Sequence, residues 1–315
     1  MDPVLIRLMA SQPVVPPPDP DDIAERRRRN NESLAAFRPS PQEGVRRTEH
    51  AVDVAGGHIA VRAYRPQSDE DRLPALLYFH GGGWHMGNLD SAEAECVFQA
   101  ADIPAALFFV DYRLAPEHPY PVPLDDCVAA YRWVVDQADE LGIDPARVAV
   151  GGTSAGANLA AALCLRVRDE GGPLPCVQLL DVPCLDLTLA SPSLAEFADG
   201  FGITSEQVAG LVALYLRQPS DAQLPYVSPL LADDLHGLPP ALIVVAELDP
   251  VRDDGERYLQ RLHEAGVEAA TLRVLAHLHQ TWMVPGSLSW SVVRDVHLAT
   301  LRRAFAGTLV PVPVS

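Results

Sequence analysis

Basic residues are scarce in this sequence. Its 24 Lys and Arg residues stand against 42 Asp and Glu residues, which gives a formal net charge of −18 at pH 7. Nucleic acids and anionic membranes bind clustered positive charge, so neither is an expected partner. The one basic run, Arg26 to Arg29, lies beside Glu25 and is interpreted as a solvated helix face.

The sequence also lacks long apolar runs and any ordered set of cysteines. No stretch reaches the roughly 18 apolar residues of a membrane span, and the proline-rich N-terminus has no apolar region typical of a signal peptide. The five cysteines are scattered and odd in number, so we expect buried thiols rather than disulfides, and none stands at metal-ligand spacing. These absences predict a cytoplasmic protein without a metal.

What the sequence does contain is a strand, a sharp turn and a helix around Ser154. The apolar residues Val148 to Val150 meet two glycines, and an alanine-rich segment follows the turn. The pentapeptide Gly152 to Gly156 fits GxSxG, in which the flanking glycines permit a tight turn that exposes the serine oxygen above the sheet. Ser154 is therefore a candidate nucleophile, although the same small residues could make a turn and nothing more.

A second glycine-rich segment, Gly81 to Gly83, follows the apolar residues Leu73 to His80. Glycines after a buried strand expose unhindered backbone N–H groups, and an oxyanion hole uses such groups together with the N–H after the nucleophile, here that of Ala155. The alternative is a flexible surface turn, which the bracketing His80 and Trp84 disfavour. Trp84 is expected to contact the substrate.

Apolar strands and amphipathic helices alternate along most of the chain, which predicts a mainly parallel sheet with helices on both faces. Residues 45–54 and 59–64 are expected to form a hairpin at a sheet edge. Further strands are expected at 73–80, 105–111, 148–150, 176–182, 241–247 and 269–275. Helices are expected at 23–37, 122–141, 203–216, 251–265, 287–305 and after Ser154.

Two segments break this alternation and are interpreted as parts of a lid. Residues 1–44 are first proline-rich and then helical, and residues 188–218 contain a helix with too many apolar positions for a free surface. The first segment carries four apolar residues suited to covering a surface: Leu5, Ile6, Leu8 and Met9. It could equally be a disordered leader. Residues 45–187 and 219–315 would then form the catalytic domain.

The acid and the base of such a fold follow the nucleophile, each at the C-terminal end of a strand. Asp249 directly follows one expected strand and precedes Pro250, so it is the best acid, and it could also serve as a helix N-cap. Of the ten histidines, His277 and His279 follow Asp249 just past a strand end. The residues alone leave both open as the base.

Several separated motifs resemble those of the hormone-sensitive-lipase-like group of α/β-hydrolase esterases. They are HGGGW at His80, DYRLAPEHPYP from Asp111, GTSAGANLA from Gly152, SPL from Ser228 and AELDPVRDDGERY from Ala246. The likeness runs from about residue 45 to the end and is greatest for the bacterial branch whose elbow reads GTSAG. It implies the α/β-hydrolase fold with a helical cap.

The resemblance also implies roles for individual residues. It makes Ser154 the nucleophile and Asp249 the acid, with oxyanion donors at Gly82, Gly83 and Ala155. His80 would shape the loop. His279 stands thirty residues after Asp249, which resembles the family's separation better than His277 does. The chain departs from the family where His279 is followed by Gln280 and Thr281 instead of glycine and an aromatic residue, and where Ala157 replaces a usual glycine.

These expectations describe a serine carboxylesterase that hydrolyses short- to medium-acyl esters through an acyl-enzyme, without a cofactor. Its expected partner is a small-molecule ester. An amidase or lactonase with the same triad is an alternative, as is a small-molecule receptor that keeps the pocket and has lost catalysis. The natural ester stays open, as does the choice between a monomer and a homodimer.

Overall fold

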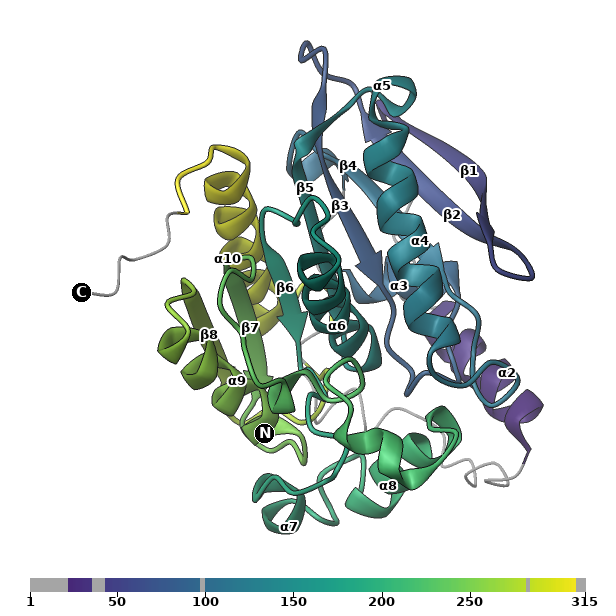
Figure 1. The fold of residues 1–315 in the computed structure, drawn as a ribbon, viewed down its shortest axis with the longest axis vertical. Coiled ribbons are helices and arrows are strands. Elements are labelled where there is room, and N and C mark those ends of the chain that lie inside the picture. The colour runs from purple at the N-terminus through teal and green to yellow at the C-terminus, as the bar shows by residue number, and fades with distance from the viewer. Residues whose placement is uncertain (1–21, 36–42, 97–99, 282–283, 310–315) are drawn as a thin grey trace.

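The computed structural model describes residues 22–35, 43–96, 100–281 and 284–309 (Figure 1). The four apolar residues expected to form part of a lid, Leu5, Ile6, Leu8 and Met9, lie outside these ranges, so their expected role stays a prediction.

The described residues form one eight-stranded sheet in the order β1-β2-β4-β3-β5-β6-β7-β8. Its strands are β1 Val45–Val54, β2 Gly57–Pro66, β3 Leu73–Phe79, β4 Ala106–Asp111, β5 Ile143–Thr153, β6 Gln178–Asp181, β7 Ala241–Ala246 and β8 Ala269–Val274. Strand β2 is antiparallel to β1 and to β4, and the other neighbours are parallel. The predicted mainly parallel sheet with a hairpin at its edge is confirmed.

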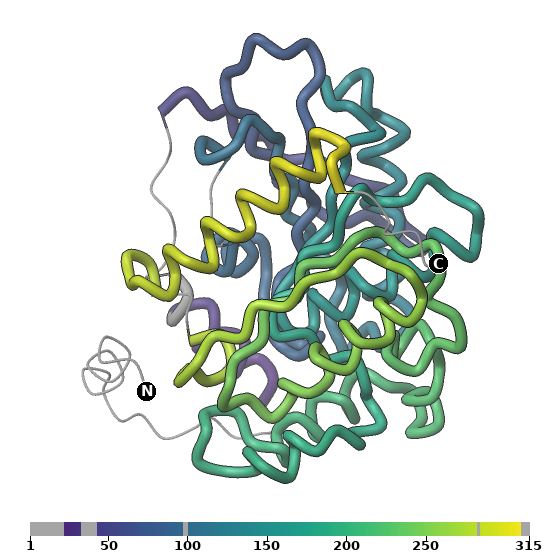
Figure 2. The backbone as a smooth tube through the Cα atoms, turned by 90° about the vertical axis from the view of Figure 1, so that its left-hand side faces the viewer, coloured from purple at the N-terminus to yellow at the C-terminus, as the bar shows by residue number. Residues whose placement is uncertain are grey.

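Helices cover both faces of this sheet, as the apolar strands require. One face carries α4 Val122–Asp136, α6 Ala155–Asp169 and α9 Arg252–Glu264, and the other carries α3 Leu89–Glu95 and α10 Leu288–Phe305. Figure 2 shows the yellow helix α10 and the green helix α9 on opposite sides of the strands. Each face therefore has its own apolar core, and strands β3 and β7 are buried along their whole length.

Two helices differ from the sequence-based expectation. The helix predicted over residues 122–141 is broken at Gln137, whose backbone has φ −95° and ψ 18°, and continues as the short helix α5 Ala138–Leu141. The sequence around Gln137 contains no glycine or proline that would predict this break. Helix α3 was not expected because its seven residues are too few to show a helical period. Its start is fixed by Asn88, whose side chain accepts the Ser91 N–H in a capping box.

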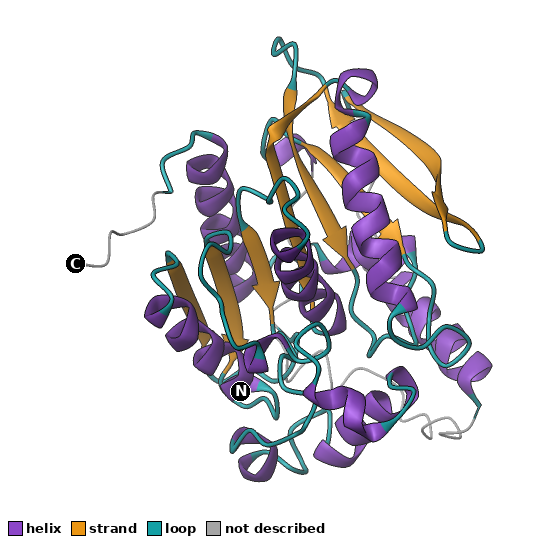
Figure 3. Cartoon of the chain, viewed as in Figure 1, coloured by secondary structure: helices purple, strands orange, loops and turns teal. Residues whose placement is uncertain are grey.

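The segment between β6 and β7 leaves the sheet and includes residues 188–218, which are expected to form part of a lid. It contains α7 Ser193–Glu196 and α8 Ser205–Tyr215, which lie beyond the arrowheads of the strands (Figure 3). Helix α2, Ile23–Ala35, which precedes the sheet in the sequence, lies toward the same end of the molecule (Figure 1). The carboxyl ends of parallel strands are where ligands bind in such sheets, so the segment between β6 and β7 lies at the end of the sheet where the site is expected.

The cysteines are all free thiols, four of them buried and Cys176 partly buried, as the sequence predicted. Among the described residues, no helix combines the length and the apolar character needed to cross a membrane.

Candidate active site

The turn at Ser154 depends on two close backbone approaches. A Cβ added to Gly156 would lie 2.0 Å from the carbonyl oxygen of Phe79, and one added to Gly152 would lie 2.6 Å from the same atom. Both positions therefore accept only glycine. Ser154 itself has φ 54° and ψ −114°. Residues other than glycine adopt this backbone conformation at a cost of about 1 kcal/mol or more. This strained conformation leaves the Ser154 side chain partly exposed at the junction between the strand and the helix.

A chain of hydrogen bonds joins Ser154, His279 and Asp249. The Nε2 atom of His279 lies 3.0 Å from the Ser154 Oγ, and its Nδ1 atom lies 2.8 Å from Asp249 Oδ2. The Asp249 side chain is fully buried, whereas that of His279 is 12% exposed. This arrangement can take the serine proton while the carboxylate fixes the orientation of the imidazole ring.

His277 faces away from this chain of bonds. Its Nδ1 atom lies 3.1 Å from Thr281 Oγ1 and its Nε2 atom lies 2.8 Å from Ser289 Oγ. Its carbonyl oxygen also accepts the N–H of Leu248, next to Asp249. Of the two histidines that the residues left open, the structure thus brings His279 to Ser154 and places His277 within the loop that carries it.

The N-cap alternative for Asp249 does not describe its position. Helix α9 begins three residues later, with Val251 at its N-cap. Asp249 Oδ1 accepts the Val251 N–H at 3.0 Å, so this carboxylate holds the turn before the helix while Oδ2 contacts His279.

The glycine loop lies against the nucleophile turn, because a Cβ added to Gly81 would lie 3.1 Å from the carbonyl oxygen of Thr153. Among the described residues, the N–H groups of Gly82 and Gly83 donate no hydrogen bond. Ala155 is the first residue of α6, so its N–H has no acceptor within the helix. The φ angles of Gly82 and Gly83, 102° and 60°, lie in the left-handed region that favours glycine. Three unpaired donors can stabilise developing negative charge on an oxygen.

His80 supports the glycine loop from within the core. Its Nδ1 atom lies 2.8 Å from the Gly81 carbonyl oxygen, and its ring stacks on Tyr112 with centroids 4.3 Å apart. The Tyr112 hydroxyl donates to the His80 carbonyl oxygen at 2.8 Å. Burial lowers the pKa of His80 to about 4, so the ring is neutral at neutral pH. It is placed to shape the loop, as the resemblance implied.

Trp84 packs against α8, and its expected contact with the substrate stays a prediction. The residue is only 2% exposed, and its ring stacks on Tyr215 of α8 with centroids 4.6 Å apart and planes 9° apart. Its indole therefore joins the glycine loop to α8. Leu211, from the same helix, lies over the loop instead, because a Cβ added to Gly83 would come within 2.7 Å of its Cδ1 atom.

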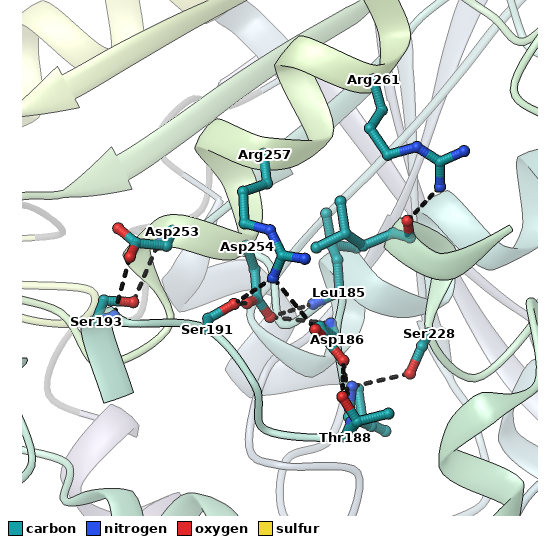
Figure 4. Close-up of polar contacts among 12 residues, drawn as sticks. Leu185, Asp186, Thr188, Ser191, Ser193, Ser228, Asp253, Asp254, Arg257 and Arg261 are labelled. Carbon is teal, nitrogen blue, oxygen red and sulfur yellow. Dashed lines mark hydrogen bonds and ion pairs between the residues drawn. The ribbon is translucent and has the colours of Figure 1, made fainter. Parts of the chain in front are cut away.

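A buried carboxylate attaches the segment that follows β6 to α9 (Figure 4). Asp254 Oδ2 accepts the N–H groups of Leu185 and Asp186 at 2.8 and 3.0 Å, and its other oxygen accepts the Ser191 hydroxyl. Arg257 donates to Asp186 and Ser191 from the same helix. Burial raises the pKa of Asp254 to about 7. The sequence does not indicate this contact, because its partners are two backbone N–H groups and a serine hydroxyl more than sixty residues away.

Arg27 joins α2 to the glycine loop, which corrects the interpretation of the basic run as a purely solvated face. Its Nε atom donates to the His85 carbonyl oxygen at 2.7 Å, and Nη2 donates to that of Ala115 at 2.9 Å. Both Nη atoms also contact the Glu117 carboxylate. Other arginines of the run pair with glutamates of their own helix, as a solvated face predicts.

No group of three or more His, Cys, Asp and Glu side chains in the described part of the chain is arranged to hold a metal ion.

Known proteins share both the sequence and the fold of this chain. A family model described as the alpha/beta hydrolase fold matches residues 76–283. The chain is 44% identical over 246 residues to the carboxylic ester hydrolase LipN of Mycobacterium tuberculosis, an alignment that covers 76% of this chain and 65% of LipN. It thus spans just under two thirds of the length of that relative.

Two solved structures cover nearly the whole chain. A hyperthermophilic esterase from the archaeon Pyrobaculum calidifontis superposes with a TM-score of 0.88 at 33% identity, covering 98% of this chain and 99% of its own. A bacterial heroin esterase superposes with a TM-score of 0.89 at 32% identity, covering 97% and 98%.

Proposed function

This chain belongs to the alpha/beta hydrolase family, in its hormone-sensitive-lipase-like group, and on that premise we propose that it hydrolyses carboxylic esters with Ser154, His279 and Asp249 as its triad. The observation that carries the proposal is the position of His279, whose two ring nitrogens reach the serine hydroxyl and the buried carboxylate. A receptor that had lost catalysis would not need this base.

In the proposed reaction, His279 accepts the Ser154 proton as the serine oxygen attacks the ester carbonyl carbon. The N–H groups of the three predicted donors, Gly82, Gly83 and Ala155, stabilise the oxyanion. His279 then gives its proton to the leaving alcohol as the carbon–oxygen bond breaks. Water attacks the acyl-enzyme by the same steps, which releases the carboxylic acid and restores the serine.

Asp249 stabilises the imidazolium that forms in each half of this cycle. Because the carboxylate is fully buried, its attraction for the charged ring is screened less than that of a surface ion pair would be. Its Oδ1 atom accepts the N–H of Val251, which fixes the orientation of the carboxylate so that Oδ2 faces His279. The residue therefore provides both orientation and charge.

The cap is proposed to comprise residues 188–218 together with the N-terminal segment that contains α2, around a catalytic domain of residues 45–187 and 219–315. Two contacts support this division. Trp84 stacks on Tyr215 of α8, and Arg27 of α2 bonds the carbonyl oxygen of His85. Both helices thus contact the loop that follows the oxyanion donors, so cap and loop would move together.

The test of the function is a comparison of p-nitrophenyl butyrate with its p-nitroanilide counterpart. We expect ester turnover with a kcat/KM at least 100-fold above that for the amide, because an amine leaving group must be protonated before it departs. Equal rates would identify an amidase. Binding of the ester without turnover would identify a receptor.

Acyl-chain length should depend on Leu211, which covers the glycine loop. Leu211→Ala removes branched carbons above Gly83, so we expect kcat/KM for p-nitrophenyl decanoate to rise about tenfold relative to the butyrate. The same substitution at Leu224, which is 40% exposed after the turn Pro219–Gln223, is the matched control and should leave the ratio unchanged. An unchanged ratio in Leu211→Ala would remove this residue from the acyl site.

A further inference from the structure

A buried carboxyl group contacts the oxyanion loop from behind. Glu95, the last residue of α3, is 6% exposed, and its Oε2 atom accepts the N–H of Gly81 at 2.6 Å. Glutamate is seldom buried this far unless a cation pairs with it. Among the described residues, no Lys or Arg side chain forms an ion pair with Glu95. Its bonded partner is instead the residue before the two donor glycines.

Among the described residues, the groups around Glu95 include no cation in contact with it. Asp181 on β6 adds negative charge and is itself paired with His297 of α10 at 3.0 Å. The other titratable neighbours are Tyr78 of β3, Tyr112 after β4, Cys96 and, beyond Gly81, His80. The neutral amide of Gln280 also lies against Gly81, where an added Cβ would meet its Nε2 atom at 2.8 Å.

These surroundings favour the protonated acid. Burial raises the pKa of Glu95 to about 8, against the lowering effect of the Gly81 N–H and with a further increase from the charge of Asp181. At neutral pH the side chain is therefore an uncharged hydrogen-bond acceptor.

We propose that Glu95 is a positioning residue whose neutral carboxyl holds Gly81, so that the N–H groups of Gly82 and Gly83 face the oxyanion; the role rests on the proposed ester hydrolysis. A neutral acid fixes the loop without placing charge behind it. An ionised Glu95 would keep the bond and would oppose the negative charge that develops on the substrate oxygen.

The decisive measurement is kcat for p-nitrophenyl butyrate between pH 6 and pH 10, with the rate of Ser154→Ala subtracted as background. We expect the wild-type kcat to fall about tenfold as Glu95 ionises and KM to change little. Glu95→Gln keeps an acceptor of the same shape and cannot ionise, so its kcat should match the wild type at pH 6.5 and stay level above pH 8. The matched control is Glu93→Gln on the same helix, whose carboxylate pairs with Arg62, and it should keep the alkaline decrease.

A second variant tests the hydrogen bond itself. Glu95→Leu leaves the Gly81 N–H without its acceptor, so kcat should fall about tenfold at every pH while KM stays within about twofold. An alkaline decrease that persists in Glu95→Gln, or a wild-type kcat in a folded Glu95→Leu protein, would overturn the proposal.

Thermal unfolding provides a readout that needs no substrate. With a folded pKa near 8 and an ordinary value of 4.5, Glu95 resists ionisation in the folded state, so its stabilising effect is complete below about pH 4.5 and is lost as the pH rises to 8. Glu95→Gln should therefore raise Tm over the wild type more at pH 9 than at pH 5. Equal differences at both pH values would overturn the proposal. If the wild type hydrolysed no ester, the esterase function would fail even where these Tm shifts appeared.

Discussion

Replacing Ser154 by alanine is expected to lower kcat for p-nitrophenyl butyrate by about 10⁵-fold or more, to a rate near that of the uncatalysed background. The substitution removes one hydroxyl oxygen and keeps the Cβ, so the strain at φ 54° and the packing of Gly152 and Gly156 against Phe79 are unchanged. The free energy of unfolding should accordingly stay within about 0.5 kcal/mol of the wild type. Steady-state kinetics and urea unfolding of the same preparation measure both quantities.

Ser220→Ala is the matched control, since Ser220 is exposed in the turn Pro219–Gln223. It should retain the wild-type kcat. If Ser154→Ala kept more than about 1% of the wild-type rate, a residual activity far above what triad loss leaves, the nucleophile would have to be another group.

The second large effect concerns the base. His279→Ala should lose about 10⁴-fold or more in kcat with a modest change in KM, because the imidazole acts on the proton rather than on the bound ester. His277→Ala should keep kcat within about tenfold of the wild type. It removes the contacts to Thr281 and Ser289 and should lower the free energy of unfolding by about 1 to 2 kcal/mol.

The pair of variants is its own control, since both histidines lie in one loop and only one reaches Ser154. A dead His277→Ala enzyme beside an active His279→Ala enzyme would reverse the assignment of the base and leave the reaction class intact.

The parts of this site that the sequence predicts are those specified by local spacing. Gly152 and Gly156 have no side chain, and Ser154 has a φ in the left-handed region. Both features act within a few residues of the turn, so the motif predicts a strand, a turn and a helix. The same holds for the glycine loop after β3. The mainly parallel sheet follows from the alternation of apolar strands with helices.

The remaining parts depend on partners distant in the chain. The residues alone could not separate His277 from His279, because both follow the same strand and only the fold of their loop decides which ring meets Asp249. The family resemblance favoured His279 by its separation from Asp249. The stacking of Trp84 on Tyr215 could not be predicted either, because the two residues are far apart in the sequence. Glu95 lies in a helix that is too short to show a helical period. Its carboxyl group accepts a backbone N–H from a residue fourteen positions earlier, and no local pattern predicts that contact.

Covalent labelling offers the most direct measurement of the proposed nucleophile. A fluorophosphonate reacts with an activated serine, so incubation of the wild type should add one adduct mass per chain, and peptide mapping should place it on Ser154. The label should be absent from Ser154→Ala and strongly slowed in His279→Ala, because the base activates the hydroxyl. Loss of hydrolytic activity with the adduct on another residue, or undiminished labelling of Ser154→Ala, would contradict the assignment of Ser154 as the nucleophile.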